Sequence, residues 1–284
     1  MSAGGPEIRR RLIVELCHGA ADARTLRAVA EMAALLELDL HGLFVEDEAL
    51  LGLAGLPFAR ELRLPTHEWQ PIDAGRIAAE LRRSAADARR LLRETAAALG
   101  VPDAFEVRRG DPAEMIAAVT MATDVVVVAA PAGPAGWVAH GAAQVQAAAH
   151  HATASLLLLP AGCTPQRGLV AALVTDARDP AMALAARAAA STHERLLVLL
   201  PAGDAAIADA ALEAAAALGV PTTRVAMSNL NGTGVEDVLH ALDRARERLV
   251  VLTRGACAAG DVAAAWRIAA GRGAAVLLVE RGSR

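Results

Sequence analysis

The sequence predicts an α/β fold of two doubly wound domains in tandem, each with a five-stranded parallel sheet. The phrase LGVP occurs at Leu99–Pro102 and again at Leu218–Pro221, each time between a helical stretch and a strand-like run. Around both copies of this phrase, short apolar runs of strand length alternate with longer stretches whose apolar residues recur at helical spacing. Such alternation is typical of parallel sheets with right-handed crossovers, helices on both faces and a ligand site beyond the carboxyl ends of the strands.

The first half begins with a leucine-rich strand at Arg11–Leu16 and a helix at Asp22–Leu38. A long amphipathic helix at Ala74–Leu99 ends at Gly100, which is a typical helix stop. The other elements expected in this half are the strands Asp39–Val45, Ala104–Arg108, Asp124–Ala130 and Ser155–Pro160, and the helices Pro112–Ala122 and Gly141–His151.

The second half restarts the pattern after a short linker at 161–168, which carries Pro165 and other turn residues. Its expected strands are Gly168–Val174, Arg195–Leu200, Thr222–Met227, Arg248–Thr253 and Ala274–Glu280, and its expected helices are Pro180–Ala190, Ala205–Leu218, Val235–Arg246 and Asp261–Ala270. We therefore place the two domains at residues 1–162 and 163–284.

The segment Glu46–Asp73 interrupts the first half and has no counterpart in the second. It mixes acids, glycines and prolines with several leucines, and it contains Phe58 and Trp69 although aromatic residues make up only 2% of the chain. We interpret this segment, residues 46–73, as an insertion. Three roles are open for it: packing on its own domain, forming a lid over the ligand side of the sheet, or binding another protein.

The composition excludes several kinds of chemistry. All 28 basic residues are Arg, so the chain has neither the Lys of a Walker-type phosphate loop nor the amine of a Schiff-base enzyme. A net charge of −4 and the scarcity of aromatic residues do not favour nucleic-acid binding. Because the sequence shows no secretory signal and no apolar run long enough to cross a bilayer, we expect a cytoplasmic protein without a membrane partner.

The layout of strands and helices in each half resembles the universal stress protein family in its tandem form. The first half carries the closer resemblance, in RRLIVEL, in RRGDPAEMIAAVTMATDVVVVAAPAGPAG and in HHATASLLLLPAG. The second half resembles the family in the order of its elements. Family members that bind ATP have an acidic residue after the first strand and, after the fourth strand, the pattern Gly-x-x-Gly, nine residues, then Gly-Ser or Gly-Thr. Such glycines let backbone amides approach a phosphate.

Both copies carry this nucleotide pattern incompletely. Gly133 and Gly136 supply the Gly-x-x-Gly of the first copy, but the next glycine is Gly141, too early and followed by Ala, and Cys17 stands at the acidic position. Asp176 stands at the acidic position of the second copy, whose loop TRGACAAGD lacks the glycine spacing. The resemblance therefore implies ATP as the candidate cofactor, with a site that is degenerate in each copy.

Two other groups of residues invite a chemical role. Cys17 and His18 follow the first strand, where a nucleophile or a metal ligand would face a substrate, although a free thiol is the simpler interpretation. Glu46, Asp47 and Glu48 follow the second strand and could recruit magnesium, although acids that begin a helix are common. We expect no catalytic residues and no metal site.

The resemblance also implies how the two halves meet and what the protein does. Because family members often dimerise through their last strand, Ser155–Pro160 and Ala274–Glu280 are expected to pair as an internal pseudo-dimer, and a further homodimer is open. The leading functional prediction is a non-catalytic stress-response or regulatory protein that acts by binding. The alternatives are an interaction scaffold that uses the 46–73 insertion and a nucleotide-binding enzyme similar to the adenine-nucleotide hydrolases.

Overall fold

The computed structural model describes residues 10–17, 22–63, 67–130, 153–163, 167–201 and 205–281. The elements of copy one are β1 (Arg11–Glu15), α1 (Ala23–Leu36), β2 (Asp39–Asp47), α2 (Glu48–Ala54), β3 (Arg60–Arg63), β4 (Glu68–Pro71), α3 (Ala74–Leu99), β5 (Asp103–Gly110), α4 (Pro112–Val119), β6 (Val125–Ala129) and β7 (Ser155–Leu159). The helix predicted at Gly141–His151 lies outside the described residues.

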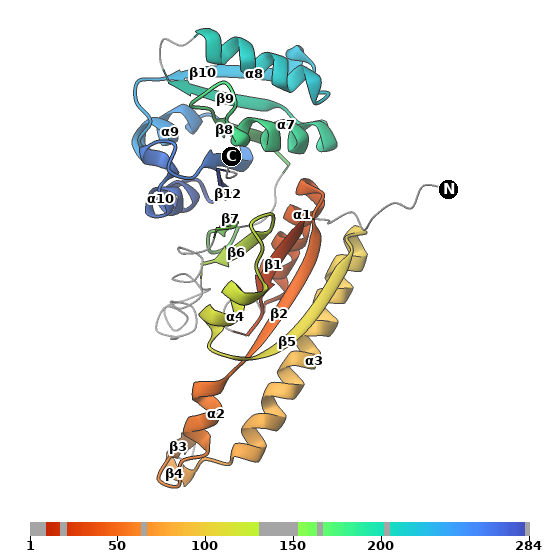
Figure 1. Ribbon diagram of the computed structural model, residues 1–284, viewed down its shortest axis with the longest axis vertical. Coiled ribbons are helices and arrows are strands. Elements are labelled where there is room, and N and C mark those ends of the chain that lie inside the picture. The colour runs from red at the N-terminus through yellow and green to blue at the C-terminus, as the bar shows by residue number, and fades with distance from the viewer. Residues whose placement is uncertain are drawn as a thin grey trace, which may run out of the picture.

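Copy two follows the order of the elements described for copy one without the insertion, and it also has two 3-10 turns and one further helix (Figure 1). Its elements are β8 (Leu169–Leu173), α7 (Pro180–Thr192), β9 (Leu196–Pro201), α8 (Ala205–Ala217), η1 (Thr222–Arg224), β10 (Val225–Leu230), α9 (Val235–Leu242), β11 (Glu247–Thr253), η2 (Ala258–Gly260), α10 (Val262–Arg272) and β12 (Ala275–Val279).

One ten-stranded sheet runs through both copies in the order β10-β9-β8-β11-β12-β7-β6-β1-β2-β5. From the middle outward, copy one reads β7-β6-β1-β2-β5 and copy two reads β12-β11-β8-β9-β10, so the two strand orders are the same. Neighbouring strands within each copy are parallel. The predicted fold class, two doubly wound five-stranded units, is confirmed.

The two copies meet at an antiparallel pair of strands, β7 and β12. Leu157 pairs with Leu277 at the centre of this seam, flanked by Leu156 opposite Leu278 and Leu158 opposite Val276. These flanking pairs exchange under a rotation about the central pair, so a pseudo-twofold axis passes through it. The predicted pairing of the last strands is confirmed.

The LGVP phrase forms the same helix stop in both copies. Gly100 and Gly219 have φ angles of 67° and 85°, in the left-handed region that glycine adopts without strain. The valine that follows donates its N–H back into the helix, from Val101 to Ala96 at 3.0 Å and from Val220 to Ala215 at 2.9 Å. Both valines are buried, so the phrase ends a helix and fixes a core residue at once.

Copy two departs from the prediction directly after its LGVP phrase. The β-branched residues after Pro221 favoured a strand, but Thr222–Arg224 forms the 3-10 turn η1, and β10 begins only at Val225. The N–H of Arg224 donates to the carbonyl oxygen of Pro221 at 2.8 Å and closes this turn. Copy one enters its strand directly at Asp103, so η1 is an addition to copy two.

Two helices, α4 and α9, end three or more residues before their predicted ends. α4 stops at Val119, because the side chain of Asp124 accepts a hydrogen bond from the N–H of Met121 at 2.8 Å and holds the chain in a turn. α9 stops at Leu242, where the N–H of Ala245 donates to the Leu242 carbonyl at 2.8 Å. In both places a turn takes the chain to the amino end of the next strand.

The insertion forms an arm, defined here as residues 48–73, that extends beyond the carboxyl end of β2 (Figure 1). β2 is longer than predicted and runs to Asp47, whose side chain caps α2 by accepting from the N–H of Ala49 at 2.8 Å. β3 and β4 then form an antiparallel hairpin at the tip. Arg76 of α3 pairs with Glu61 of β3, and α2 packs against α3, β2 and β5. The arm therefore contacts its own domain through α2 and β3, while its large apolar side chains stay exposed.

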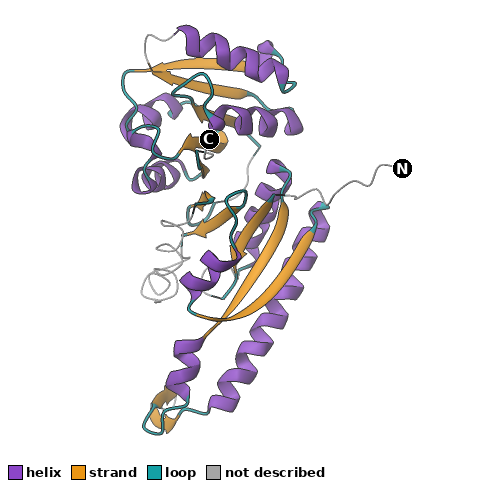
Figure 2. Cartoon of the chain, viewed as in Figure 1, coloured by secondary structure: helices purple, strands orange, loops and turns teal. Residues whose placement is uncertain are grey.

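Each face of the sheet carries an apolar cluster beneath its helices, and the layers are visible in Figure 2. One cluster joins the sheet to α1, α3, α7 and α8, and the other joins it to α4, α9 and α10. Close helix packing depends on small residues: a Cβ on Gly42 of β2 would lie 2.8 Å from Leu92 Cδ2 of α3. None of the described helices has both the length and the apolar character needed to span a membrane.

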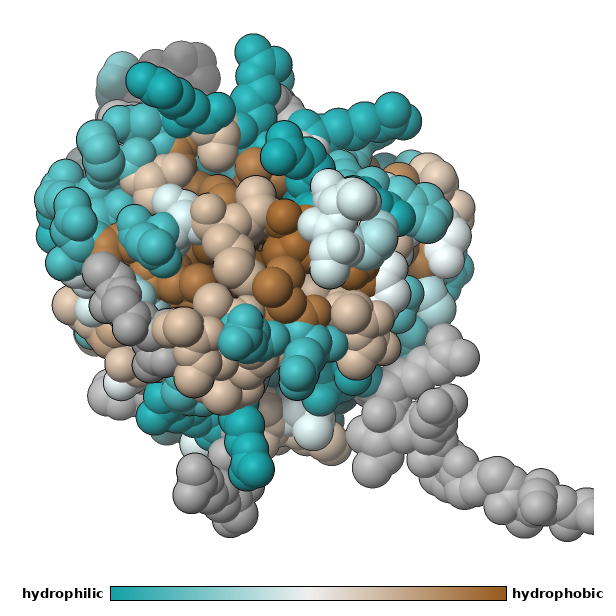
Figure 3. Space-filling view, turned by 90° about the horizontal axis from the view of Figure 1, so that it is seen from above, coloured by the Kyte–Doolittle hydropathy of each residue, from teal (hydrophilic) through white to brown (hydrophobic). Residues whose placement is uncertain are grey.

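The edge strands are β5 in copy one and β10 in copy two. Figure 3 views the molecule from the end that carries α8 and β10 and shows a central apolar area ringed by hydrophilic side chains. Met227 of β10 is 37% exposed, and Val107 of β5 is 47% exposed. Neither edge is therefore fully covered by the described part of the chain.

Candidate functional site

The candidate site of each copy lies beyond the carboxyl ends of its first and fourth strands, where the direction of winding reverses. This switch point falls between β1 and β6 in copy one and between β8 and β11 in copy two. Cys17 follows β1, and Asp176 follows β8. The three predicted loop residues, Gly133, Gly136 and Gly141, lie outside the described residues.

The strand register corrects the equivalence of Cys17 and Asp176. The N–H of Leu16 donates to Leu43 at 2.9 Å, and the N–H of Val174 makes the matching bond to Leu199 at 3.0 Å. Leu16 and Val174 are therefore equivalent, and Cys17 matches Thr175, not Asp176. The counterpart of Asp176 is His18, which lies outside the described residues.

At the switch point of copy one, a buried carboxylate lies beside Cys17. Glu15 is the last residue of β1 and only 6% exposed, and its Oε1 accepts the N–H of Cys17 at 2.6 Å. The side chain of Cys17 packs against the apolar cluster of α1 and α3, so this thiol contributes to the core. Sequence reasoning missed Glu15, although an acid inside the apolar run RLIVEL was a visible signal.

The switch point of copy two is filled by a different buried carboxylate, that of Asp179. It is 3% exposed and accepts hydrogen bonds from the N–H and hydroxyl of Thr175, at 2.9 and 3.0 Å, and from the N–H of Ala181 at 3.0 Å. The hydroxyl of Thr253, at the end of β11, also donates to it. One carboxylate thus connects β8, α7 and β11 where a ligand would lie.

The loop after β11 is folded back on its own strand. The N–H of Gly255 donates to the Gly260 carbonyl at 3.1 Å, and a Cβ on Gly260 would lie only 2.3 Å from the Thr253 carbonyl oxygen. The first amides of α10 are occupied as well, because Asp261 accepts from the N–H of Ala263 at 3.0 Å. A helix N-terminus favours an anion, and here the chain supplies it.

Asp176 lies on the rim of this closed region. Its carboxylate is half exposed and pairs with Arg281 at 3.2 Å, and it also accepts the N–H of Arg178 at 2.9 Å. The structure therefore engages Asp176 in contacts within copy two.

The acids after β2 also have partners within the chain. Glu46 pairs with Arg109 of β5 at 2.9 Å, and Asp47 caps α2. Within the described ranges, no group of three or more His, Cys, Asp and Glu side chains is arranged to hold a metal ion.

The guanidinium of Arg11 and the thiol of Cys163 contribute to the packing of the fold. Arg11 forms a two-pronged pair with the buried Asp124, at 2.6 and 3.1 Å, and these hydrogen bonds raise the pKa of the guanidinium against the opposing effect of burial. Burial raises the pKa of the Cys163 thiol, which makes its reactive thiolate form less populated.

Comparison with known proteins gives structural matches only. No protein-family model and no curated protein sequence matches the chain. A universal stress protein from Archaeoglobus fulgidus DSM 4304 superposes with a TM-score of 0.65 at 13% identity, covering 95% of this chain and 97% of the other. The chain has the fold of a tandem universal stress protein.

Two more structures share this fold over most of their length. A protein from Pseudomonas aeruginosa UCBPP-PA14 assigned to the universal stress proteins has a TM-score of 0.53 at 14% identity, covering 96% of this chain and 93% of its own. The cytoplasmic domain of a prokaryotic cation chloride cotransporter has a TM-score of 0.51 at 12% identity, covering 96% and 95%. These matches confirm the universal stress protein fold in its tandem form, and at such identities they speak for the fold alone.

Proposed function

We propose that this protein is a non-catalytic regulatory protein of the universal stress type, acting in a stress response by binding. The observation that carries the proposal is the closed switch point of copy two. Asp179 holds the hydroxyl of Thr253 and the amides of Thr175 and Ala181, and the glycine-containing loop is folded against the strand. Freeing these groups for a nucleotide would cost about 1–3 kcal/mol for each buried group left unsatisfied.

Copy two then serves as a structural partner of copy one. It extends the sheet through β12, and the seam buries Leu157 and Leu277 almost completely. In copy one, the carboxylate of Glu15 accepts a hydrogen bond from the N–H of Cys17, whereas a catalytic acid would have to be free to reach its substrate. Both features favour binding over turnover.

Calorimetry with ATP and magnesium, together with a phosphate-release assay, tests the proposal. We expect no phosphate release from the intact protein and no binding in copy two. ATP binding that Gly133→Val abolishes, without phosphate release, would identify a nucleotide as the regulatory ligand of copy one. Phosphate release that Gly133→Val abolishes would overturn the proposal in favour of an enzyme similar to the adenine-nucleotide hydrolases.

The exposed arm favours a second candidate function, an interaction scaffold. Phe58 and Trp69 are 75% and 62% exposed, and Leu53 is 49% exposed, which is unusual for large apolar side chains gathered on one segment. A scaffold would lose its partner when Phe58 and Trp69 are both replaced by Ser, while Met227→Ser at the far edge of the sheet serves as the control. Equal recovery of the partner by both variants in a pull-down would reject this candidate.

A further inference from the structure

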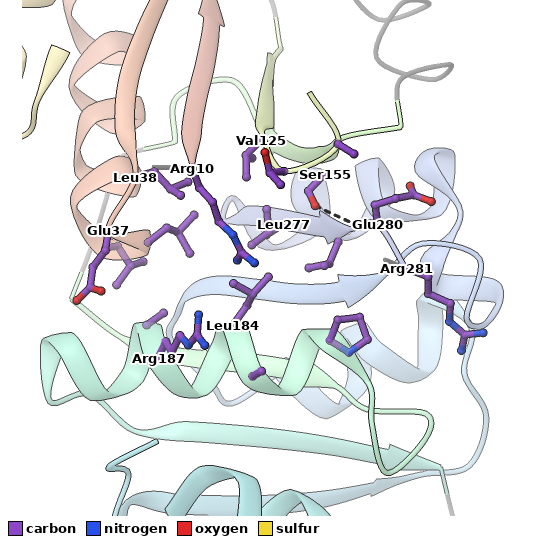
Figure 4. A pocket seen from close by; sticks show the side chains of 18 of the residues that line it. Arg10, Glu37, Leu38, Val125, Ser155, Leu184, Arg187, Leu277, Glu280 and Arg281 are labelled. Atoms are coloured by element: carbon purple, nitrogen blue, oxygen red, sulfur yellow. Dashed lines mark hydrogen bonds between the residues drawn. The ribbon is translucent and has the colours of Figure 1, made fainter. Parts of the chain in front are cut away.

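A groove crosses the seam between the two copies, on the face of the sheet that carries α1 and α7 (Figure 4). Its volume is about 1040 Å³, comparable with the larger small-molecule sites of proteins. Leu277 and Val279 of β12 and Val125 of β6 line it from the sheet, and Leu36 of α1 and Leu184 of α7 line it from the helices. The lining among the described residues is mixed: threonine, serine and charged side chains lie beside these apolar ones, and no aromatic ring is present that would stack on a base.

Two guanidinium groups point into this groove from different elements. Arg10 precedes β1 and Arg187 projects from α7, and Figure 4 shows both side chains directed into the space between the helices. Within the described part of the chain, neither guanidinium group forms an ion pair or a hydrogen bond. Two like charges that converge over an apolar surface favour an anion between them.

The other charged residues at the groove are already neutralised or lie at its mouth. Arg281 pairs with Asp176 at 3.2 Å, and Glu280 pairs with Arg254 at 3.0 Å. Glu37, which is exposed as Arg10 and Arg187 are, points away from the two arginines (Figure 4). The net charge that faces the interior of the groove is therefore positive.

Ser155 adds a hydrogen-bonding group at the start of β7. Its Oγ accepts the N–H of Glu280 at 3.1 Å, as the dashed line in Figure 4 shows. A hydroxyl that accepts one bond keeps its own O–H as a donor, and no described residue receives that proton.

We infer that this groove binds an amphiphilic anion, an apolar chain that ends in one carboxylate. The guanidinium groups of Arg10 and Arg187 bind the carboxylate, and the chain lies along Leu184 and Leu277. The inference goes beyond the proposed function, since the groove is apart from the switch point of copy one and does not require a nucleotide to bind there.

The pseudo-twofold axis relates this groove to a second position in the chain. Part of this second position lies between the start of α1 and the end of β7, where Thr25, Ala28, Leu159 and Cys163 leave a space of only about 20 Å³. That space has room for about one water molecule. The described residues at this second position therefore leave no comparable groove, and we expect a stoichiometry of one ligand per chain.

Calorimetry with dodecanoate below its micelle concentration tests the inference, with dodecanol and dodecyl phosphate as comparison probes. We expect saturable binding of dodecanoate at one per chain and at least tenfold weaker binding of dodecanol. Arg187→Ala and Arg10→Ala should each weaken dodecanoate binding about tenfold. Arg83→Ala, on the exposed surface of α3, is the matched control and should leave binding unchanged.

A steric variant separates the groove from its charges. Ala183 lines the groove and is half-buried, so Ala183→Phe should block dodecanoate while the thermal unfolding curve shows that the protein stays folded. Equal affinity for dodecanol and dodecanoate, tighter binding of dodecyl phosphate, or unchanged binding by both arginine variants would overturn the inference. A nucleotide result in either direction leaves it standing.

Discussion

The two switch points of this protein lie at equivalent places in the fold, but their buried acids come from different elements. In copy one, the buried acid Glu15 belongs to the strand itself and holds the backbone of the residue that follows. In copy two, the buried acid Asp179 belongs to the helix and reaches across to Thr253 on the fourth strand. The equivalent of Glu15 in copy two is Leu173, which is apolar and 1% exposed.

This difference teaches that the sheet and the carboxyl ends respond to separate constraints. Strand order is fixed by apolar runs that must be buried on two faces, and both copies satisfy this with Val, Leu and Ala. The carboxyl ends need only satisfy whichever polar groups are buried there, and different residues achieve this. Substitutions that exchange or remove these polar groups test whether the carboxyl ends of the strands in each copy are stabilised independently.

The largest effect is expected from exchanging Glu15 and Leu173 between the copies. Leu173→Glu places a carboxylate in an apolar position without an arranged partner, which should cost about 3–5 kcal/mol of unfolding free energy. Glu15→Leu removes the acceptor for the Cys17 amide in exchange for apolar burial and should cost only about 1–2 kcal/mol. Urea titration measures both, and a smaller loss for Leu173→Glu than for Glu15→Leu would show that copy two also accommodates an acid at this strand end.

The next effect compares the two helix caps, Asp22 of α1 and Asp179 of α7. Both cap a first helix, but Asp22 is exposed whereas Asp179 is buried against Thr253. Asp22→Ala should cost about 1 kcal/mol, the usual value of a cap. Asp179→Ala should cost about 3 kcal/mol, because buried donors on three elements lose their acceptor. Equal shifts in thermal midpoint would mean that the contact between Asp179 and Thr253 adds nothing.

A smaller effect is expected at the loop that closes copy two. Gly260→Ala would bring a Cβ within 2.3 Å of the Thr253 carbonyl oxygen, so the loop must shift, at a cost of about 1–3 kcal/mol. Gly52→Ala in α2, where a Cβ meets nothing within 4 Å, is the control and should be neutral or stabilising. An unchanged melting curve for Gly260→Ala would contradict the tight closure of this loop.

The fold could be predicted where its signals are local. The bounds of α3 match the prediction: Gly100 stops its end as expected, and the structure shows that Asp73 caps its start, so both signals lie beside the helix. The LGVP stops are local in the same way. By contrast, η1 was predicted as strand because its threonines have strand propensity, and only the structure shows the turn that Pro221 begins.

The candidate sites could be predicted less well, because their parts are distant in sequence. Asp179 and Thr253 are 74 residues apart, and no sequence pattern near Thr253 indicates that its hydroxyl donates to Asp179. The groove draws Arg10, Arg187 and Leu277 from three separate elements, which become neighbours only through the seam. The pairing of the last strands was accessible through the resemblance to a family, whereas the groove that this pairing creates was not.

The smallest expected effect concerns His41 of β2, whose equivalent in copy two is Leu197. Burial lowers the pKa of the His41 imidazole, and the charge of Arg11 lowers it further, against the attraction of Glu106, whose Oε2 lies 3.5 Å from Nε2. The unfolded chain, with an ordinary histidine pKa of about 6.5, therefore takes up a proton before the folded chain does.

The sign of the pH dependence follows from this order of protonation. Above about pH 6.5 both states are neutral at this residue, and as the pH falls through that value toward the lower folded pKa, stability is lost. His41→Leu gives copy one the residue of copy two and should reduce the fall in thermal midpoint between pH 7 and pH 5. His240→Leu, at a histidine with an 89% exposed side chain, should leave that fall unchanged. If the thermal midpoint of His41→Leu falls with pH as steeply as that of the parent protein, the His41 imidazole takes up a proton as readily in the folded state as in the unfolded state.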